Sequence, residues 1–162
     1  MNEIRLKIEI STDSVEEKDL YHRDWIGMLS IDDCLLNENY AIDYIDLAKS
    51  AIAGGDYYIL TCGCGYPGCA RLDEPIKVTH EADRICWHIT DPRPERRFEF
   101  SRVAYSASIL DFLRQAQAEV PRPENEDEFP FGYYGFHPHH LDWCVRTLES
   151  GLIVGTGYED PI

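Results

Sequence analysis

The stretch YYILTCGCGYPGCARLDEP, residues 57–75, gathers three cysteines that could carry metal chemistry. Thiolates are preferred ligands of zinc, and structural sites are closed by four donors. The common spacing of roughly two to four residues between paired cysteines is missing, although a single intervening glycine still permits a tight turn. One interpretation is therefore a zinc site whose ligands are Cys62, Cys64, Cys69 and Cys86, with His80 or His88 as alternative fourth ligands.

Two other interpretations of this loop need no metal. A redox dithiol favours a C-x-x-C motif at a helix start, whereas this loop has C-x-C in an acidic chain, which raises the thiol pKa. The structural alternative is a tight corner in which Pro67 and the glycines form turns. Cys62 would then continue the alternation of Tyr58 and Leu60 and lie in the core.

A second group of potential ligands or nucleophiles lies near the C-terminus. His137, His139 and His140 precede Cys144, and His140 and Cys144 are spaced to share one helix face. A Cys–His pair is the minimal unit of thiol catalysis, so a thiol-dependent enzyme using Cys64 or Cys144 is one hypothesis. The alternative is that the histidines are loop residues and that Cys144 belongs to the core.

An acidic and aromatic segment between residues 119 and 138 resembles a recognition loop. Tyrosine and phenylalanine provide contact area at low entropic cost, and acidic side chains steer a basic partner toward it. Folding back of the aromatic rings onto the sheet is the structural alternative. The predicted partner-binding residues are Glu124, Glu126, Asp127, Glu128, Phe131, Tyr133 and Tyr134.

The whole chain is acidic, with 30 acidic and 15 basic residues and a formal net charge of -15. Such a potential repels phosphate, so we expect no nucleic-acid partner and favour a basic protein partner. No apolar run has the roughly 18 residues of a membrane helix, and no signal-peptide pattern opens the sequence. We therefore expect a cytoplasmic protein whose cysteines stay reduced and which does not associate with membranes.

The hydrophobic periodicity predicts a single α+β domain over residues 1–162, with an antiparallel sheet of about six strands and two or three helices packed on it. The predicted helices span about 40–53, capped by Asn39, then 105–120, capped by Ser106 or Ser108, and 139–151. The predicted strands cover residues 3–10, 25–31, 56–61, 75–80, 84–90 and 97–102, and the last four form a meander.

The segment 57–118 resembles a loose group of small uncharacterised bacterial proteins. The shared features are the T-C-x-C-G-x-x-x-C loop beginning at Thr61, a strand containing Trp87, and a Phe-x-Phe strand at Phe98 and Phe100. Small acidic proteins of this kind include immunity partners of bacterial toxins, and the resemblance implies no catalytic residue. Together these features predict an immunity-like or regulatory protein that holds a basic partner, with zinc binding and thiol catalysis as the alternatives.

Overall fold

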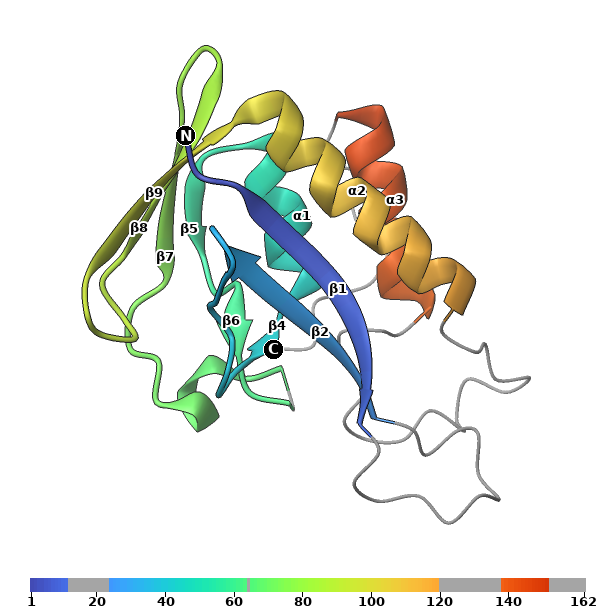
Figure 1. The fold of residues 1–162 in the computed structure, drawn as a ribbon, viewed down its shortest axis with the longest axis horizontal. Helices are drawn as coiled ribbons and strands as arrows, with labels where there is room; N and C mark the ends of the chain where they lie inside the picture. Colours follow the sequence, from blue (N-terminus) through green and yellow to red (C-terminus); the bar gives the residue numbers. More distant parts are fainter. Residues whose placement is uncertain (12–23, 64, 120–137, 152–162) are drawn as a thin grey trace.

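The computed structural model describes residues 1–11, 24–63, 65–119 and 138–151 of the chain (Figure 1). These ranges contain three α-helices and nine strands, which confirms the predicted α+β class. The helices are α1 (Tyr44–Ile52), α2 (Arg102–Glu119) and α3 (Pro138–Ser150), with a short 3₁₀ helix η2 (Pro67–Ala70). The strands are β1 (Ile4–Ser11), β2 (Asp24–Ile31), β3 (Cys34–Leu35), β4 (Ala41–Ile42), β5 (Gly55–Tyr57), β6 (Leu60–Thr61), β7 (Ile76–His80), β8 (Arg84–Ile89) and β9 (Arg96–Ser101).

The described strands pair antiparallel in three sheets, where the sequence predicted one sheet. The N-terminal sheet has the order β1-β2-β3, the small sheet consists of β4 and β6, and the meander sheet has the order β5-β7-β8-β9. The run 56–61 was predicted as one strand, but its two ends belong to different sheets. The reason is that the Tyr58 amide donates to the Asp46 carboxylate and the Ile59 carbonyl accepts from the Asp43 amide, so both residues bond to the start of α1 instead.

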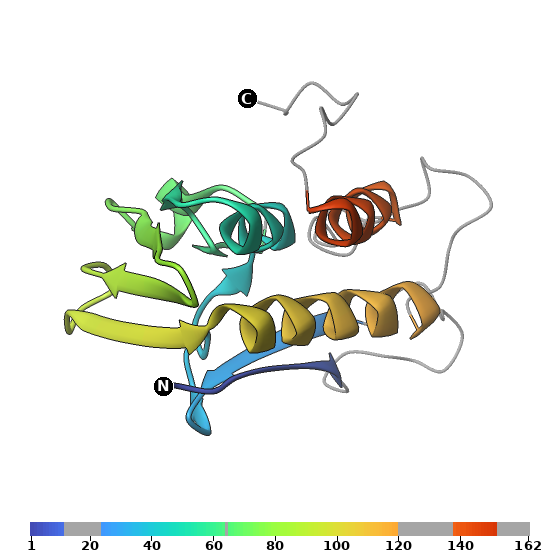
Figure 2. The same cartoon turned by 90° about the horizontal axis from the view of Figure 1, so that it is seen from above.

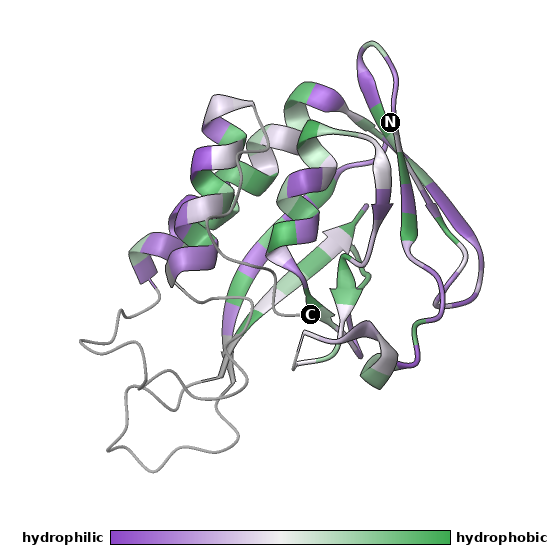
Figure 3. Cartoon of the chain, turned by 180° about the vertical axis from the view of Figure 1, so that it is seen from behind, coloured by the Kyte–Doolittle hydropathy of each residue, from purple (hydrophilic) through white to green (hydrophobic). Residues whose placement is uncertain are grey.

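Helix α2 lies between the N-terminal sheet and the layer formed by α1 and α3 (Figure 2). Along β1 the side chain of Ile4 is buried and Leu6 and Ile8 pack against the core, while Arg5 and Lys7 face solvent. Burial alternates in the same way along β7 and β8, which carry both hydrophilic and hydrophobic residues (Figure 3). For β1, the period of two that the sequence predicted is confirmed.

An aromatic cluster joins the meander sheet to α2. The ring centroids of Trp87 and Phe100 are 5.4 Å apart, and the Tyr105 ring lies 5.8 Å from Trp87 and 5.2 Å from Phe100. The Tyr105 hydroxyl also forms a buried 2.7 Å hydrogen bond with the Ser50 hydroxyl on α1. The cluster therefore ties α1, α2, β8 and β9 into one core.

Two helix starts differ from prediction. Helix α1 begins at Tyr44, because residues 41–42 pair with β6, and its N-cap is Asp43 rather than Asn39. Helix α2 begins at Arg102, directly after β9, so neither Ser106 nor Ser108 caps it. By contrast, α3 ends before Gly151, which adopts a φ of +67° as expected of a glycine stop.

None of the helices in the described ranges is both long enough and apolar enough to cross a bilayer.

Candidate functional site

The cysteine loop follows β6 and is built from consecutive turns. The Gly65 amide donates to the Cys62 carbonyl at 2.9 Å, and Gly65 has a φ of +80°. Helix η2 follows and ends at Arg71, which lies in the left-handed region with its amide bonded to the Gly68 carbonyl at 3.1 Å. Leu72 then enters the core at 5% exposure and anchors the end of the loop. The predicted corner is thus present.

The end of the cysteine loop is fastened to the turn between β8 and β9. The Asp73 amide donates to the Asp91 carboxylate at 2.6 Å, and the Thr90 hydroxyl donates to the Glu74 carboxylate. The Tyr58 hydroxyl reaches the Asp73 carbonyl at 3.4 Å. These bonds hold the loop at the end of the meander sheet where β8 turns into β9, and none of them uses a cysteine.

The cysteines of the loop are in different states. Cys62 is disulfide-bonded, so the prediction that all cysteines stay reduced is wrong for this residue. Cys69, on η2, is exposed and carries a free thiol. Cys64 lies outside the described residues. A sulfur in a disulfide is not a thiolate, so Cys62 does not offer zinc the ligand that the prediction required.

The structure places the other predicted zinc ligands against partners outside the loop. Cys86 alternates with buried Ile85 and Trp87, so it lies on the outer face of the meander sheet, where β-pairing sets it opposite Thr79 and Glu99. Burial raises the pKa of the Cys86 thiol, and the negative charges of Glu81 and Glu99 raise it further.

Both candidate histidines are engaged elsewhere. A ring nitrogen of His80 lies 2.8 Å from the Ser50 carbonyl, and one of His88 lies 2.7 Å from the Glu95 carboxylate. Among the residues that the structure describes, no three histidine, cysteine or acidic side chains converge as a metal-binding group. The zinc site therefore stays a prediction, because the described residues do not bring its proposed ligands together.

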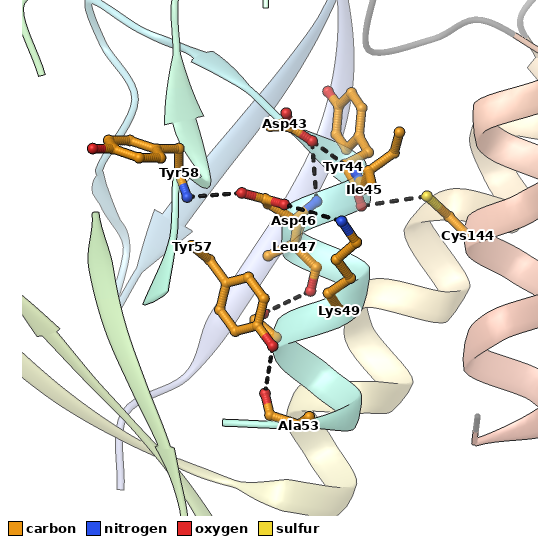
Figure 4. Close-up of polar contacts among 11 residues, drawn as sticks. Asp43, Tyr44, Ile45, Asp46, Leu47, Lys49, Ala53, Tyr57, Tyr58 and Cys144 are labelled. Carbon is orange, nitrogen blue, oxygen red and sulfur yellow. Dashed lines mark hydrogen bonds and ion pairs between the residues drawn. The ribbon is translucent and has the colours of Figure 1, made fainter. Parts of the chain in front are cut away.

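The second predicted cluster is centred on a buried cysteine. Cys144 is fully buried on α3, and its thiol donates to the Tyr44 carbonyl at 3.3 Å (Figure 4). Burial raises the pKa of this thiol well above its ordinary value. A protonated, buried thiol is a poor nucleophile, so the geometry favours the core interpretation of Cys144. His139 is exposed at the start of α3, and His137 lies outside the described residues.

The start of α1 holds a pair of acidic residues that the sequence analysis missed. One Asp43 carboxylate oxygen accepts from the amides of Ile45 and Asp46, each at 3.0 Å (Figure 4). Asp46 lies 3.8 Å from the Lys49 ammonium and also accepts from the Tyr58 amide at 2.8 Å. An acidic residue three positions after a capping aspartate is a helix-start signal, and it was available in the sequence IDYID.

The environment of Asp43 disfavours its charge. Burial raises the pKa of the Asp43 carboxyl to about 6, and the neighbouring Asp46 carboxylate adds to this rise. The hydrogen bonds from the two backbone N–H groups and the positive charge of Lys49 act in the opposite direction and lower this pKa. A carboxyl that titrates near neutral pH often marks a functional site, but here the carboxylate of Asp43 accepts from two amides of its own helix, so its evident role is to begin α1.

The predicted partner-binding residues, Glu124 to Tyr134, lie outside the described residues, although their attachment points do not. The segment 120–137 joins the end of α2 to the start of α3. These helices lie side by side, linked by hydrogen bonds from Arg114 to Glu149 and from Gln117 to Asp142.

Comparisons of the chain with protein-family models, with curated proteins and with solved structures gave no match.

Proposed function

We propose that this protein is an immunity-like or regulatory binding protein that holds a basic protein partner through an acidic and aromatic surface. The surface consists of the segment 120–137, with Glu124, Glu126, Asp127 and Glu128 steering the partner and Phe131, Tyr133 and Tyr134 making contact area. A bacterial toxin domain is the kind of partner that the sequence resemblance suggests, and the cytoplasm is the expected location.

The observation that carries this proposal is where the two long connections leave the fold. Asn2 bonds to Glu99 of β9, and α2 begins directly after β9, so β1 and α2 start together and run in the same direction (Figures 1 and 2). The connection 12–23 after β1 and the connection 120–137 after α2 are therefore attached at one end of the molecule.

The composition of these two connections suits a basic partner. Together they contain eight acidic side chains and three arginines or lysines, and residues 120–137 add five aromatic rings. Both connections carry an excess of acidic residues, and both are attached at the same end of the described fold. Complementary charge of this kind accelerates encounter and excludes partners of the same sign.

The length of the second connection also favours a role beyond joining helices. Helices that pack side by side are usually joined by roughly two to eight residues, and connections longer than about 12–15 residues are commonly functional. Here 18 positions, 120–137, lie between α2 and α3. The extra length is not needed to bring the two helices together.

A pull-down from the source cell at low salt tests the proposal. The full-length protein is compared with a quadruple variant in which the four acids of the segment are neutralised: Glu124→Gln, Glu126→Gln, Asp127→Asn and Glu128→Gln. We expect the wild type to retain a basic protein that the quadruple variant loses. Retention of the same proteins by both would contradict the proposal.

A control quadruple variant separates a local surface from overall charge. It neutralises four exposed acids at other places, Glu38→Gln, Asp56→Asn, Asp73→Asn and Asp111→Asn. It has the same net charge as the first variant, and we expect it to keep the partner. Equal loss in both variants would show that only the total charge matters and would overturn the assigned surface.

A further inference from the structure

We propose that the free edge of β1 pairs with β1 of a second copy of this chain, so that two N-terminal sheets join into one continuous antiparallel sheet. Strand β1 stands first in the order β1-β2-β3, and no described residue pairs with its other edge. At eight residues, Ile4–Ser11, it is one of the two longest strands in the described ranges. A long unpaired edge is a template for a further strand. This contact goes beyond the proposed function, which concerns residues 120–137.

The backbone groups of β1 are directed alternately toward β2 and toward the free edge. The Asp32 amide donates to the Glu3 carbonyl at 2.9 Å, and opposite residues of an antiparallel pair are bonded at every second position. The bonded positions of β1 are therefore the odd-numbered ones of residues 3–9. The N–H and C=O groups of Leu6 and Ile8 point away from β2, where an added strand would meet them.

The hydrogen bonds on the other side of β2 agree with this alternation. Leu29 lies opposite Leu6 in the register of the two strands. Its amide donates to the Asn37 side chain at 2.8 Å, and its carbonyl accepts from the Leu36 amide at 2.8 Å. Both backbone groups of Leu29 are thus directed away from β1, so those of Leu6 are directed away from β2.

The charge of this edge suits a second copy of the chain. Two acidic and two basic side chains alternate with the aliphatic ones and cancel, namely Glu3, Arg5, Lys7 and Glu9. A chain with a net charge of -15 repels its own copy, and a neutral strand adds nothing to that repulsion. The side chains of Lys7 and Glu9 are 66% and 48% exposed, so both are accessible to an adjacent strand.

A two-fold axis at Ile8, near the middle of β1, pairs the two strands without opposing like charges. Ile8 then lies opposite Ile8 of the second copy, and Lys7 of each copy lies opposite Glu9 of the other on the solvent face. An axis at Lys7 would set the two Lys7 ammonium groups opposite each other, and an axis at Leu6 would set Arg5 opposite Lys7. Directly opposed like charges destabilise a sheet, whereas opposite charges stabilise it.

The same contact would remove apolar surface from water. Leu6 and Ile8 lie on the core side of β1 but are only partly buried, whereas Ile4 on that side is 4% exposed. Neighbouring strands lie about 4.7–4.9 Å apart, so the aliphatic side chains of the second copy would lie beside these two. Pairing therefore satisfies free backbone groups and covers apolar side chains together.

Sedimentation velocity of the full-length protein over a wide range of concentration, at physiological salt, tests the pairing. We expect a monomer–dimer equilibrium for the wild type. K7E and E9K each place like charges opposite each other twice in the dimer, so each should weaken it by about tenfold or more. The double variant K7E/E9K restores the opposite charges and should recover the wild-type dissociation constant.

These variants also separate local pairing from total charge. K7E makes the chain more acidic and E9K makes it less acidic, so total charge alone would weaken the dimer in the first and strengthen it in the second. The local pairing weakens it in both. Circular dichroism of each variant should match the wild type, because Lys7 and Glu9 lie on the solvent face.

Hydrogen exchange of single amides locates the contact on β1. We expect the amides of Leu6 and Ile8 to exchange quickly in dilute, monomeric protein and slowly in the dimer. The amides of Arg5 and Lys7 are directed toward β2 and should be protected in both states. Leu6 and Ile8 amides that are already protected in the monomer would show that another segment of the same chain covers this edge, which would overturn the proposal.

Two sedimentation results would also overturn it. One is a wild type that stays monomeric up to its highest soluble concentration. The other is a dimer that K7E and E9K leave unchanged or shift only according to total charge. The quadruple variant of residues 124–128 should keep the dimer, and K7E should keep the captured basic partner. Failure of this inference and failure of the proposed function therefore give separate results.

Discussion

Asp43 shows how one side chain can begin a helix and destabilise the fold at the same time. Its carboxylate satisfies two free amides of α1, and its own amide donates to the Ile59 carbonyl at 2.9 Å. The same position brings the carboxylate out of water and close to Asp46, which together raise its pKa to about 6. The proton is therefore bound more tightly in the folded chain than in the unfolded one.

This difference predicts a stability loss with rising pH. An unfolded aspartate ionises near its ordinary pKa of 3.8, whereas folded Asp43 ionises near 6. Between these values the folded state binds more protons, so the contribution of Asp43 to the free energy of unfolding falls as pH rises and stays low above about 6. D43N keeps a capping oxygen without the charge. We expect the free energy of unfolding of D43N, taken relative to that of the wild type, to increase by about 1–3 kcal/mol from pH 4 to pH 7.5.

Urea unfolding of both proteins at these two pH values measures the change. D43A removes the cap and should cost about 1 kcal/mol at low pH, where the charge is absent in both states. D111N neutralises an exposed acid on α2 and controls for the loss of one charge. A stability difference between D43N and wild type that does not change with pH would contradict the assigned role of Asp43.

At the scale of elements, the edge of β2 is completed by a side chain instead of a strand. Strand β3 is two residues long and pairs only with the end of β2. Beyond β3, the side chain of Asn37 forms the hydrogen bonds to the β2 backbone. The Leu29 amide donates to Asn37 Oδ1 at 2.8 Å, and Asn37 Nδ2 donates to the Gly27 carbonyl at 2.8 Å. Asn37 is 3% exposed, so these bonds are shielded from water.

We expect N37A to destabilise the protein by about 2–4 kcal/mol, because it leaves a buried amide and a buried carbonyl without partners. N39A, at an exposed asparagine in the same connection, is the matched control and should change stability by less than about 0.5 kcal/mol. Thermal or urea unfolding measures both. Equal stability of N37A and N39A would show that water or another group replaces the Asn37 side chain.

The elements also show what the sequence could predict. Strict alternation identified β1, and the hairpin of β7 and β8 with its neighbour β9 followed from short alternating runs between turns. Local periodicity could not show that residues 41–42 pair with residues 60–61, because that contact depends on distant chain segments. The shortened α1 and the division of residues 56–61 between two sheets both follow from that pairing.

Less of the candidate site than of the fold could be predicted from the sequence. The corner of the cysteine loop could be predicted, because glycine and proline act through local backbone preferences. The positions of Cys86, His80 and His88 could not, because each depends on strand register and on the packing of α1. A one-residue change of register would exchange the outer and inner faces of β8.

At the scale of the whole molecule, charge is balanced on the meander sheet and unbalanced elsewhere. On this sheet Arg84 pairs with Glu99 at 3.1 Å, and Glu95 bonds to His88 and to Arg97. Residues 61–120 carry nine acids and eight bases, whereas residues 1–60 and 121–162 together carry 21 acids and seven bases. The net charge of -15 therefore comes almost entirely from the two ends of the sequence, where the connections 12–23 and 120–137 lie.

The most direct test of the proposed binding surface is the affinity of the captured partner as a function of salt. We predict that the dissociation constant rises with salt for the wild type and the control quadruple variant, and that the quadruple variant of residues 124–128 binds at least tenfold more weakly at low salt (about 1.4 kcal/mol) with a flatter salt dependence. Equal affinity and equal salt dependence in all three proteins would contradict the account.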